Sequence, residues 1–273
     1  PDPVSAEYGF MRDSLLPQMY ATLGKNAAHE ASALLFETGK VFGKVTIPAK
    51  GEMPAKDQPT ERELLSLGFV GPVGREALRR RLPLNEEEAV LWMKGAVEEL
   101  VGRLHAGRVE FVAADHPAFA KGAALQVKLN GKAVGVLGAV SAKLRHPFRL
   151  TTQMALAELD LEPLTRRFDA AGKVTPVPAF PMVKRDIAFV AGSGVTHEAV
   201  EKCIRKAAPP ELTAVTLFDI FTSKDIGKGR RSFAYSPAFR SADRTLTDDE
   251  VNRAFAKIVE ALRASLGVEV RDN

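Results

Sequence analysis

The order of segments in the last third of the chain constrains its fold most strongly. Runs typical of strands occur at 184–190, 217–221 and 232–240, and helices are expected at 196–207 and 247–266. A further short strand would follow the last helix. Strand, helix, strand, strand, helix, strand within about 90 residues is the split βαβ plan of a ferredoxin-like domain. The last helix also begins with a capping box, Thr247-Asp-Asp-Glu250, which specifies the fold and implies no ligand.

The composition limits the class of protein. The chain has 273 residues, with 45% hydrophobic and 26% charged residues, which is ordinary for a globular protein large enough for two domains. It has no apolar run long enough for a membrane span and does not open with a signal peptide, so we expect a cytoplasmic protein with no membrane partner. Cys203 is the single cysteine, and the five histidines lack metal-ligand spacing, so we expect no metal site.

The segment Thr175–Pro181 carries three prolines in seven residues and is predicted to be an extended linker. It would separate a first domain at 1–174 from a second at 182–273. The first domain is expected to be a mostly antiparallel sheet with helices, so the fold class is α+β. Its predicted elements are a helix capped by Ser14 and running toward Asn26, strands at 33–42, 64–70 and 154–161, a long helix opened by Asn85-Glu-Glu-Glu88, and a hairpin turning at Asn130-Gly131. Trp92 on the long helix is expected to be a packing residue.

The predicted third strand of the second domain has two different faces. Phe233, Tyr235 and Phe239 share one parity, and Ser232, Ala234, Ser236 and Arg240 share the other. The aromatic side must bury against the two helices, which leaves an open side that is small, polar and basic. Small residues allow a nucleobase to approach, and Arg240 could meet a phosphate or stack on a base.

The preceding strand offers two candidate contacts to RNA. We expect Asp219 and Phe221 to face outward, with Phe221 stacking on an unpaired base and Asp219 accepting from a base edge. The alternative is that Phe221 belongs to the core and Asp219 caps a turn. The segment 224–244 contains six basic and two acidic residues, an excess of four positive charges. This excess is consistent with binding of a phosphate backbone, and equally with a solvent-exposed basic loop. The basic residues are Lys224, Lys228, Arg230, Arg231, Arg240 and Arg244, and the acidic residues are Asp225 and Asp243.

The segments Lys184-Arg-Asp-Ile-Ala-Phe-Val190, Leu217-Phe-Asp-Ile-Phe221 and Ser232–Arg240 resemble the ferredoxin-fold anticodon-binding domain of the bacterial phenylalanyl-tRNA synthetase beta subunit family. Several short segments in the first half of the chain also resemble that family and occur in the same order as in its members. They are Met11–Pro17, Leu35–Phe42, Lys94-Gly95, His116-Pro117 and Gly135–Gly138. The resemblance covers essentially the whole chain. It implies a first domain that copies the class II synthetase fold without catalysing and packs on the alpha subunit. It also implies that the chain starts inside this core, without the family's upstream modules.

The resemblance further implies that the second domain binds the anticodon stem-loop of tRNA(Phe), and that DNA is not a partner. Carried onto matching positions, the contacts would come from Asp219, Phe221, Ser232, Arg185 and Arg271. Arg185 and Arg271 could equally be surface salt-bridge residues. Pro237 departs from the aliphatic residue usual in the family, and a proline in a central strand suggests a bulge.

Class II adenylation needs two arginines on the phosphates of ATP, one in an Arg-x-Glu loop and one in a glycine-rich segment. Here Arg149 is followed by Leu150 and Thr151, and the segment ending at Gly138 has no arginine before Arg145. We therefore predict no catalytic residue and no cofactor in this chain, with ATP and Mg²⁺ used by the whole synthetase. Two alternatives are a single-chain phenylalanyl-tRNA synthetase and a ferredoxin-like protein-interaction module that binds no RNA.

Overall fold

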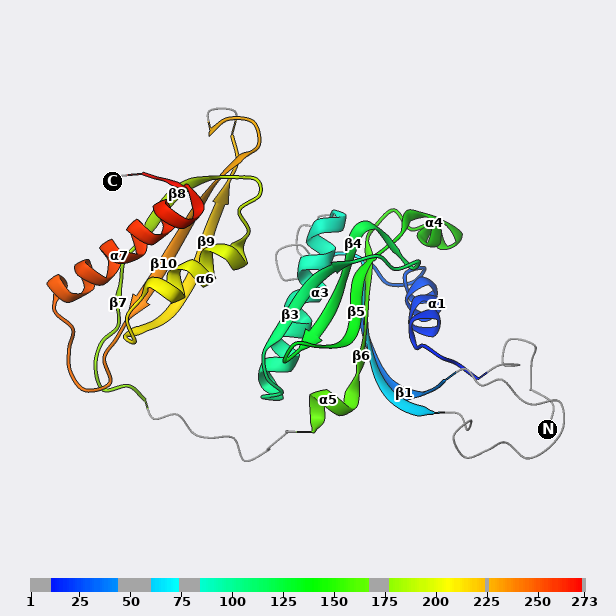
Figure 1. The fold of residues 1–273 in the computed structure, drawn as a ribbon. Coiled ribbons are helices and arrows are strands. Elements are labelled where there is room, and N and C mark those ends of the chain that lie inside the picture. Colours follow the sequence, from blue (N-terminus) through cyan, green and yellow to red (C-terminus); the bar gives the residue numbers. More distant parts are fainter. Residues whose placement is uncertain (1–10, 44–59, 74–83, 167–176, 224–225, 272–273) are drawn as a thin grey trace, which may run out of the picture. The chain divides into compact units, whose positions relative to one another are not determined.

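The computed structural model describes residues 11–43, 60–73, 84–166, 177–223 and 226–271, and the chain separates into two compact units at 1–172 and 173–273 (Figure 1). The predicted linker at 175–181 falls partly outside the described residues, and its role stays a prediction. Within the described ranges, no helix is long and apolar enough to cross a membrane.

The described part of the first unit is built on a six-stranded antiparallel sheet with the order β1-β2-β6-β5-β4-β3. Its strands are β1 (Ala33–Phe42), β2 (Glu61–Val70), β3 (Val109–Ala114), β4 (Phe119–Leu129), β5 (Lys132–Val140) and β6 (Met154–Asp160). Its helical segments are α1 (Leu16–Asn26), α3 (Glu86–Arg103), α4 (Ala142–Arg145), the 3-10 turn η3 (His146–Phe148) and α5 (Leu161–Thr165). The antiparallel sheet with helices confirms the predicted fold class.

Helices α1 and α3 cover opposite faces of this sheet (Figure 1). On β6, Met154 and Leu156 belong to the cluster that α1 closes, whereas Ala155 and Ala157 belong to the cluster that α3 closes. Successive side chains of a strand point to opposite faces, so a strand covered on both sides buries every residue. This double burial explains why the start of β6 reads as a continuous apolar run.

Two local predictions for this unit are confirmed. Asn85 and Glu88 form a capping box at the start of α3, with the Glu88 amide donating to Asn85 Oδ1 at 2.9 Å and the Asn85 amide donating to Glu88 Oε2 at 2.8 Å. Asn130 and Gly131 have φ angles of 51° and 81°, the positive values of a type I′ hairpin turn between β4 and β5.

The predicted cap of α1 is displaced by one residue. Leu15, not Ser14, is the N-cap residue, although the Leu16 amide still donates to the Ser14 hydroxyl at 3.1 Å. The carboxylate of Glu158 on β6 accepts from the Leu15 amide at 2.5 Å and from the Ser14 hydroxyl at 2.8 Å. A distant carboxylate therefore supplies most of the capping, which local sequence could not indicate.

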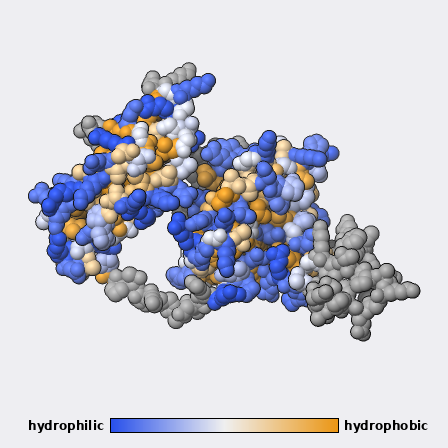
Figure 2. Space-filling view, viewed as in Figure 1, coloured by the Kyte–Doolittle hydropathy of each residue, from blue (hydrophilic) through white to orange (hydrophobic). Residues whose placement is uncertain are grey.

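Trp92, which the sequence predicts to be a packing residue, is only partly buried, because its side chain is 48% exposed. Helix α3 packs over β4, β5 and β6, so the α3 side of β1 and β2 extends past the helix. An apolar groove of about 480 Å³ remains there, lined by Leu34, Phe69, Val73, Leu91, Trp92, Gly95 and Ala96. On the face of the molecule that Figure 2 shows, hydrophilic residues in blue alternate with hydrophobic residues in orange.

The second unit has the predicted ferredoxin-like order. Its elements are β7 (Val183–Lys184), β8 (Ile187–Gly192), α6 (His197–Ala207), β9 (Leu212–Phe221), β10 (Arg230–Phe239), α7 (Asp248–Leu266) and β11 (Glu269–Val270). Strand β10 is central and antiparallel to its neighbours, with β9 along one edge and β8 and β7 along the other; β11 pairs with the far edge of β8. Segments β7 and β8 together form the first strand of the βαββαβ plan.

Pro237 lies in the central strand, and the sheet accommodates it by a break in the neighbouring strand. The pairing of β10 with β8 ends at Tyr235, and its pairing with β7 begins at Ala238. The Arg185 amide donates to the Pro237 carbonyl at 3.2 Å, so the side of Pro237 that lacks an N–H faces the break. The predicted irregularity therefore occurs in the neighbouring strand, which is divided into β8 and β7, whereas β10 continues through Pro237.

Candidate nucleic-acid interface

Helices α6 and α7 pack on one face of the second sheet and leave the other face uncovered by either helix. Phe233, Tyr235 and Phe239 are 3%, 0% and 0% exposed on the helix side, as the alternation of β10 predicted. The opposite parity of β10 contributes Ser232 and Ala234 to the other side. We call that side the open face.

A bulge in β9 decides which of its residues reach the open face. Tyr235 pairs with Leu217 and Ala234 pairs with Asp219, so Phe218 is an extra residue in the ladder. Downstream of it, Phe221 pairs with Ser232. Because cross-strand partners project to the same side of a sheet, the register places Asp219 and Phe221 on the open face. Both are exposed, and the Phe221 side chain is 54% exposed.

The open face consists of two rows of residues that run across the four strands. The first row is Arg271, Ala188, Ala234 and Asp219, and the second is Glu269, Val190, Ser232 and Phe221. Adjacent strands lie about 4.8 Å apart, so each row spans about 14 Å from edge to edge. Small side chains form the floor, and the aromatic ring and charged groups lie at the two edges. This spacing suits a flat base lying on the strands.

The open face has little net charge. Arg230 Nη2 lies 2.8 Å from Glu269 Oε2 in an ion pair, and both residues have the parity of this face. Arg271 is exposed and makes no ion pair with any residue that the structure describes. The face thus carries two basic residues, Arg230 and Arg271, and two acidic residues, Glu269 and Asp219, so its formal charges balance in number although Arg271 is unpaired among the described residues.

Arg185 is not brought together with Asp219 and Phe221. It lies at the break between β7 and β8, where its guanidinium contacts α7. Nη2 is 2.7 Å from Asp248 Oδ1, and Nε donates to Asn252 Oδ1 at 3.1 Å. This geometry corresponds to the salt-bridge alternative for Arg185.

Ser232 and Arg240 occupy different parts of the sheet. Ser232 is on the open face but only 9% exposed, so its hydroxyl belongs to the floor. Arg240 follows the far end of β10, where its amide donates to the Glu211 carbonyl at 2.9 Å. Arg240 lies eight positions beyond Ser232, a distance of about 26 Å along a strand, so the two cannot contact one nucleotide.

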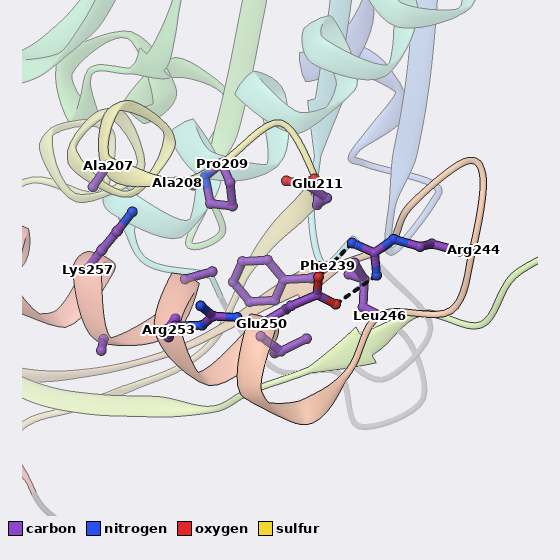
Figure 3. Close-up of a pocket in the computed structure, with 13 residues that line it drawn as sticks. Ala207, Ala208, Pro209, Glu211, Phe239, Arg244, Leu246, Glu250, Arg253 and Lys257 are labelled. Carbon is purple, nitrogen blue, oxygen red and sulfur yellow. Dashed lines mark hydrogen bonds and ion pairs between the residues drawn. The ribbon is translucent and has the colours of Figure 1, made fainter.

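Two of the basic residues between 224 and 244 are neutralised by carboxylates that lie outside this segment. Glu269 pairs with Arg230, and Glu250 pairs with Arg244 through contacts of 2.6 and 2.8 Å (Figure 3). These contacts, with the amide and hydroxyl of Thr247, hold the pKa of Glu250 at about 2, below its ordinary value of 4.5. Residues 224–225 lie outside the described ranges. The local basic excess is therefore smaller than composition suggested.

The Arg244–Glu250 pair borders a hollow of about 590 Å³ on the helix side of the unit (Figure 3). Apolar residues of α6, β10 and α7, including Ala207, Phe239 and Val251, line it together with Lys257. Because α6 and α7 cover the face opposite to Asp219 and Phe221, this hollow is separate from the open face.

Each half of the chain matches a known protein family. Residues 1–161 match the family described as the phenylalanyl tRNA synthetase beta chain CLM domain, and residues 178–271 match the ferredoxin-fold anticodon binding domain. A pyrrolysyl-tRNA synthetase structure from Desulfitobacterium hafniense overlaps 56% of this chain and 47% of its own, with 15% identity and a TM-score of 0.38.

Curated relatives match along almost the whole chain. The phenylalanine–tRNA ligase beta subunit of Clostridium tetani is 32% identical over 99% of this chain, and that of Symbiobacterium thermophilum is 32% identical over 99%. The chain spans 32% and 29% of those two proteins, or about a third of their length. Because the family match covers residues 1–161, more than half of the chain, the chain belongs to the phenylalanyl-tRNA synthetase beta chain family.

Proposed function

We propose that this chain is the part of a cytoplasmic phenylalanine–tRNA ligase beta subunit that binds the anticodon stem-loop of tRNA(Phe) and docks on the catalytic alpha subunit. The observation that carries the proposal is the open face, where the exposed Phe221 ring and the Asp219 carboxylate border a floor of small side chains. An exposed ring stacks on an unpaired base, and a carboxylate accepts from a base amino group.

Residue placement and similarity support tRNA as the ligand in different ways. Asp219, Phe221, Ser232 and Arg271 lie in the two rows of one face, which is the arrangement expected of a surface that holds a base. The match to an anticodon-binding domain and the names of the relatives supply the class of RNA. Arg185 and Arg240 would contribute only to a longer contact with the stem.

The catalytic steps are assigned to the partner subunit, because the described residues of the first unit do not fit ATP. Arg145 is the first arginine after the glycine segment, and its guanidinium group donates hydrogen bonds to backbone carbonyls of the same unit. Nε donates to the Val140 carbonyl at 3.2 Å and Nη1 to the Thr152 carbonyl at 3.0 Å. A side chain at Gly138 would meet the Ala123 carbonyl at 2.5 Å, so that glycine serves strand packing. ATP and Mg²⁺ would then bind in the alpha subunit.

The apolar groove supports docking on a partner protein. Leu34 and Phe36 on β1 are 67% and 75% exposed, and Leu91 and Trp92 on α3 are 55% and 48% exposed. Co-purification with the alpha subunit tests this surface: a Leu34→Glu and Trp92→Glu double variant, which changes two residues that line the groove, should no longer retain the partner. Val112→Glu changes a 43% exposed apolar residue on β3 and serves as the control. Equal retention by both variants would remove the groove from the proposal.

Binding of the full chain to tRNA(Phe) and to a non-cognate tRNA, across a salt series, tests the proposed function. We expect a lower Kd for tRNA(Phe) and a fall in affinity as salt rises, because RNA phosphates release counterions on binding. Absence of binding at low salt would favour the alternative of a protein-interaction module without RNA. Equal affinity for both tRNAs would contradict the proposed specificity.

A further inference from the structure

A hollow of about 640 Å³ lies at the end of the second sheet, where β9 ends and β10 begins. It is lined by Ser193, Thr222, Ser223, Gly227, Lys228, Gly229, Arg230 and Arg231. Thr222 directly follows Phe221, so the hollow begins one residue beyond the aromatic ring. Since the open face itself has little net charge, attraction of a polyanion must come from neighbouring groups such as these.

The backbone of this hollow forms a turn in which two amide groups have no partner among the described residues. The Arg230 amide donates to the Gly227 carbonyl at 3.3 Å, which closes a four-residue turn, and Gly229 has a φ of +77°. The Ser193 amide donates to the Gly229 carbonyl at 2.8 Å and fixes this turn to the end of β8. Within the described residues, the amides of Lys228 and Gly229 have no hydrogen-bond partner. Successive free amides in a turn form a concavity that binds anions.

The side chains of the hollow reinforce this preference for an anion. Arg230 is held by Glu269, but Lys228 and Arg231 are exposed and make no ion pair with any described residue. Three hydroxyl groups, those of Ser193, Thr222 and Ser223, add donors that suit phosphate oxygens. No carboxylate lines the hollow among the described residues.

We propose that this hollow binds a backbone phosphate of the RNA strand whose base stacks on Phe221. The inference rests on the proposed function, since it requires RNA on the open face. The proposal assigns base recognition and phosphate binding to two different surfaces. The open face holds the base and distinguishes one RNA from another, whereas Lys228, Arg231 and the free amides hold the phosphate whatever the sequence.

The salt dependence of tRNA binding by the full chain tests this division. In the Lys228→Ala and Arg231→Ala double variant, the slope of log K against log salt should become shallower by about 0.7 to 0.9 for each phosphate that the variant no longer neutralises. The affinities for tRNA(Phe) and the non-cognate tRNA should fall by the same factor. The control is Lys202→Ala with Lys206→Ala, which removes the same charge from exposed positions on α6 and should leave the slope close to that of the wild type.

The possible outcomes separate the two proposals. If the wild-type chain prefers tRNA(Phe) and Phe221→Ala weakens binding, but the Lys228 and Arg231 variant keeps the wild-type slope, the phosphate site is wrong and the proposed function stands. An equal change of slope in the α6 control would also overturn the site, because net charge alone would then explain the effect. If the wild-type chain binds neither tRNA, both proposals fail. A thermal unfolding curve for each variant verifies that it is folded.

Discussion

The hydroxyl of Tyr235 lies 2.8 Å from Nδ1 of His197 and links the central strand β10 to helix α6. The Tyr235 ring is fully buried and stacks against Phe189, with 5.8 Å between centroids. Nε2 of His197 is 3.8 Å from the Glu201 carboxylate, which favours the tautomer with a proton on Nε2 and an acceptor at Nδ1. Burial, with a smaller effect of Glu201, raises the pKa of Tyr235, so the hydroxyl remains a donor.

Replacing Tyr235 with Phe should therefore lower the free energy of unfolding by about 0.5–1.5 kcal/mol, the usual contribution of one hydrogen bond. The loss stays modest because His197 is partly exposed and water can replace the hydroxyl. Urea unfolding of Tyr235→Phe, His197→Ala and the double variant measures the coupling of the pair. Strictly additive losses would mean that the bond contributes nothing.

Replacing Phe221 with Ala should weaken tRNA(Phe) binding by about 1–3 kcal/mol, the usual contribution of one stacked base. Stability should change by less than about 0.5 kcal/mol, because the ring is half-exposed. Ile220→Ala is the matched control: this residue is 50% exposed on the same strand but pairs with Phe233, on the helix side. Equal losses of affinity in the two variants would contradict recognition by the open face.

Replacing Thr247 with Ala should cost about 1 kcal/mol of stability and leave tRNA affinity unchanged. The Glu250 amide donates to Thr247 Oγ1 at 3.4 Å and the Thr247 amide donates to Glu250 Oε2 at 2.9 Å, so the predicted capping box is confirmed. Thr247→Ser keeps the hydroxyl and should behave as the wild type. A large loss of affinity with no loss of stability would instead mean that Thr247 takes part in binding RNA.

The depressed pKa of Glu250 predicts a dependence of stability on pH. Its contribution should be fully present above 4.5, the ordinary pKa of the carboxyl group, and should be lost as the pH falls toward about 2. Glu250→Gln removes the titrating group. The stability difference between wild type and variant should thus be largest at pH 7 and shrink steadily below pH 4.5. A difference that is constant from pH 7 to pH 3 would disprove the linkage.

The purified chain should show no phenylalanine-dependent exchange of pyrophosphate into ATP, because the described first unit has no free arginine pair for the phosphates. The assay should include the complete synthetase of a related bacterium as a positive control. Exchange that follows this chain through further purification would instead favour the single-chain synthetase.

Much of the fold could be predicted from the sequence where the determining contacts are local. Asn85 and Glu88, Asn130 and Gly131, and the alternation of aromatics along β10 each act within a few residues, so their patterns give caps, a turn and a buried face. The cap of α1 differs because Glu158, far along the chain, supplies it.

The candidate site was predicted less completely because its charges are paired by tertiary contacts. The positions of Glu269 and Glu250 beside Arg230 and Arg244 follow from the packing of β11 and α7, which no local pattern encodes. The sequence did not indicate the proposed anion site at Lys228, because a charge pattern contains no information on backbone amides. A Gly-x-Gly pattern within a basic hairpin loop was the available signal.

The extra residue Phe218 in β9 reverses the relation between residue number and sheet face along this strand. Before Phe218, even-numbered residues such as Thr216 share the side of Ser236; after it, odd-numbered residues share the side of Ala234 and Ser232. A simple count of two from Thr216 would have turned Phe221 inward. Removing Phe218 would place Asp219 next to Leu217 in an unbroken ladder and leave the same side chains facing outward. A relative of this protein could therefore lack this position and keep its recognition surface, whereas deletion of Ile220 would reverse Phe221 relative to Asp219.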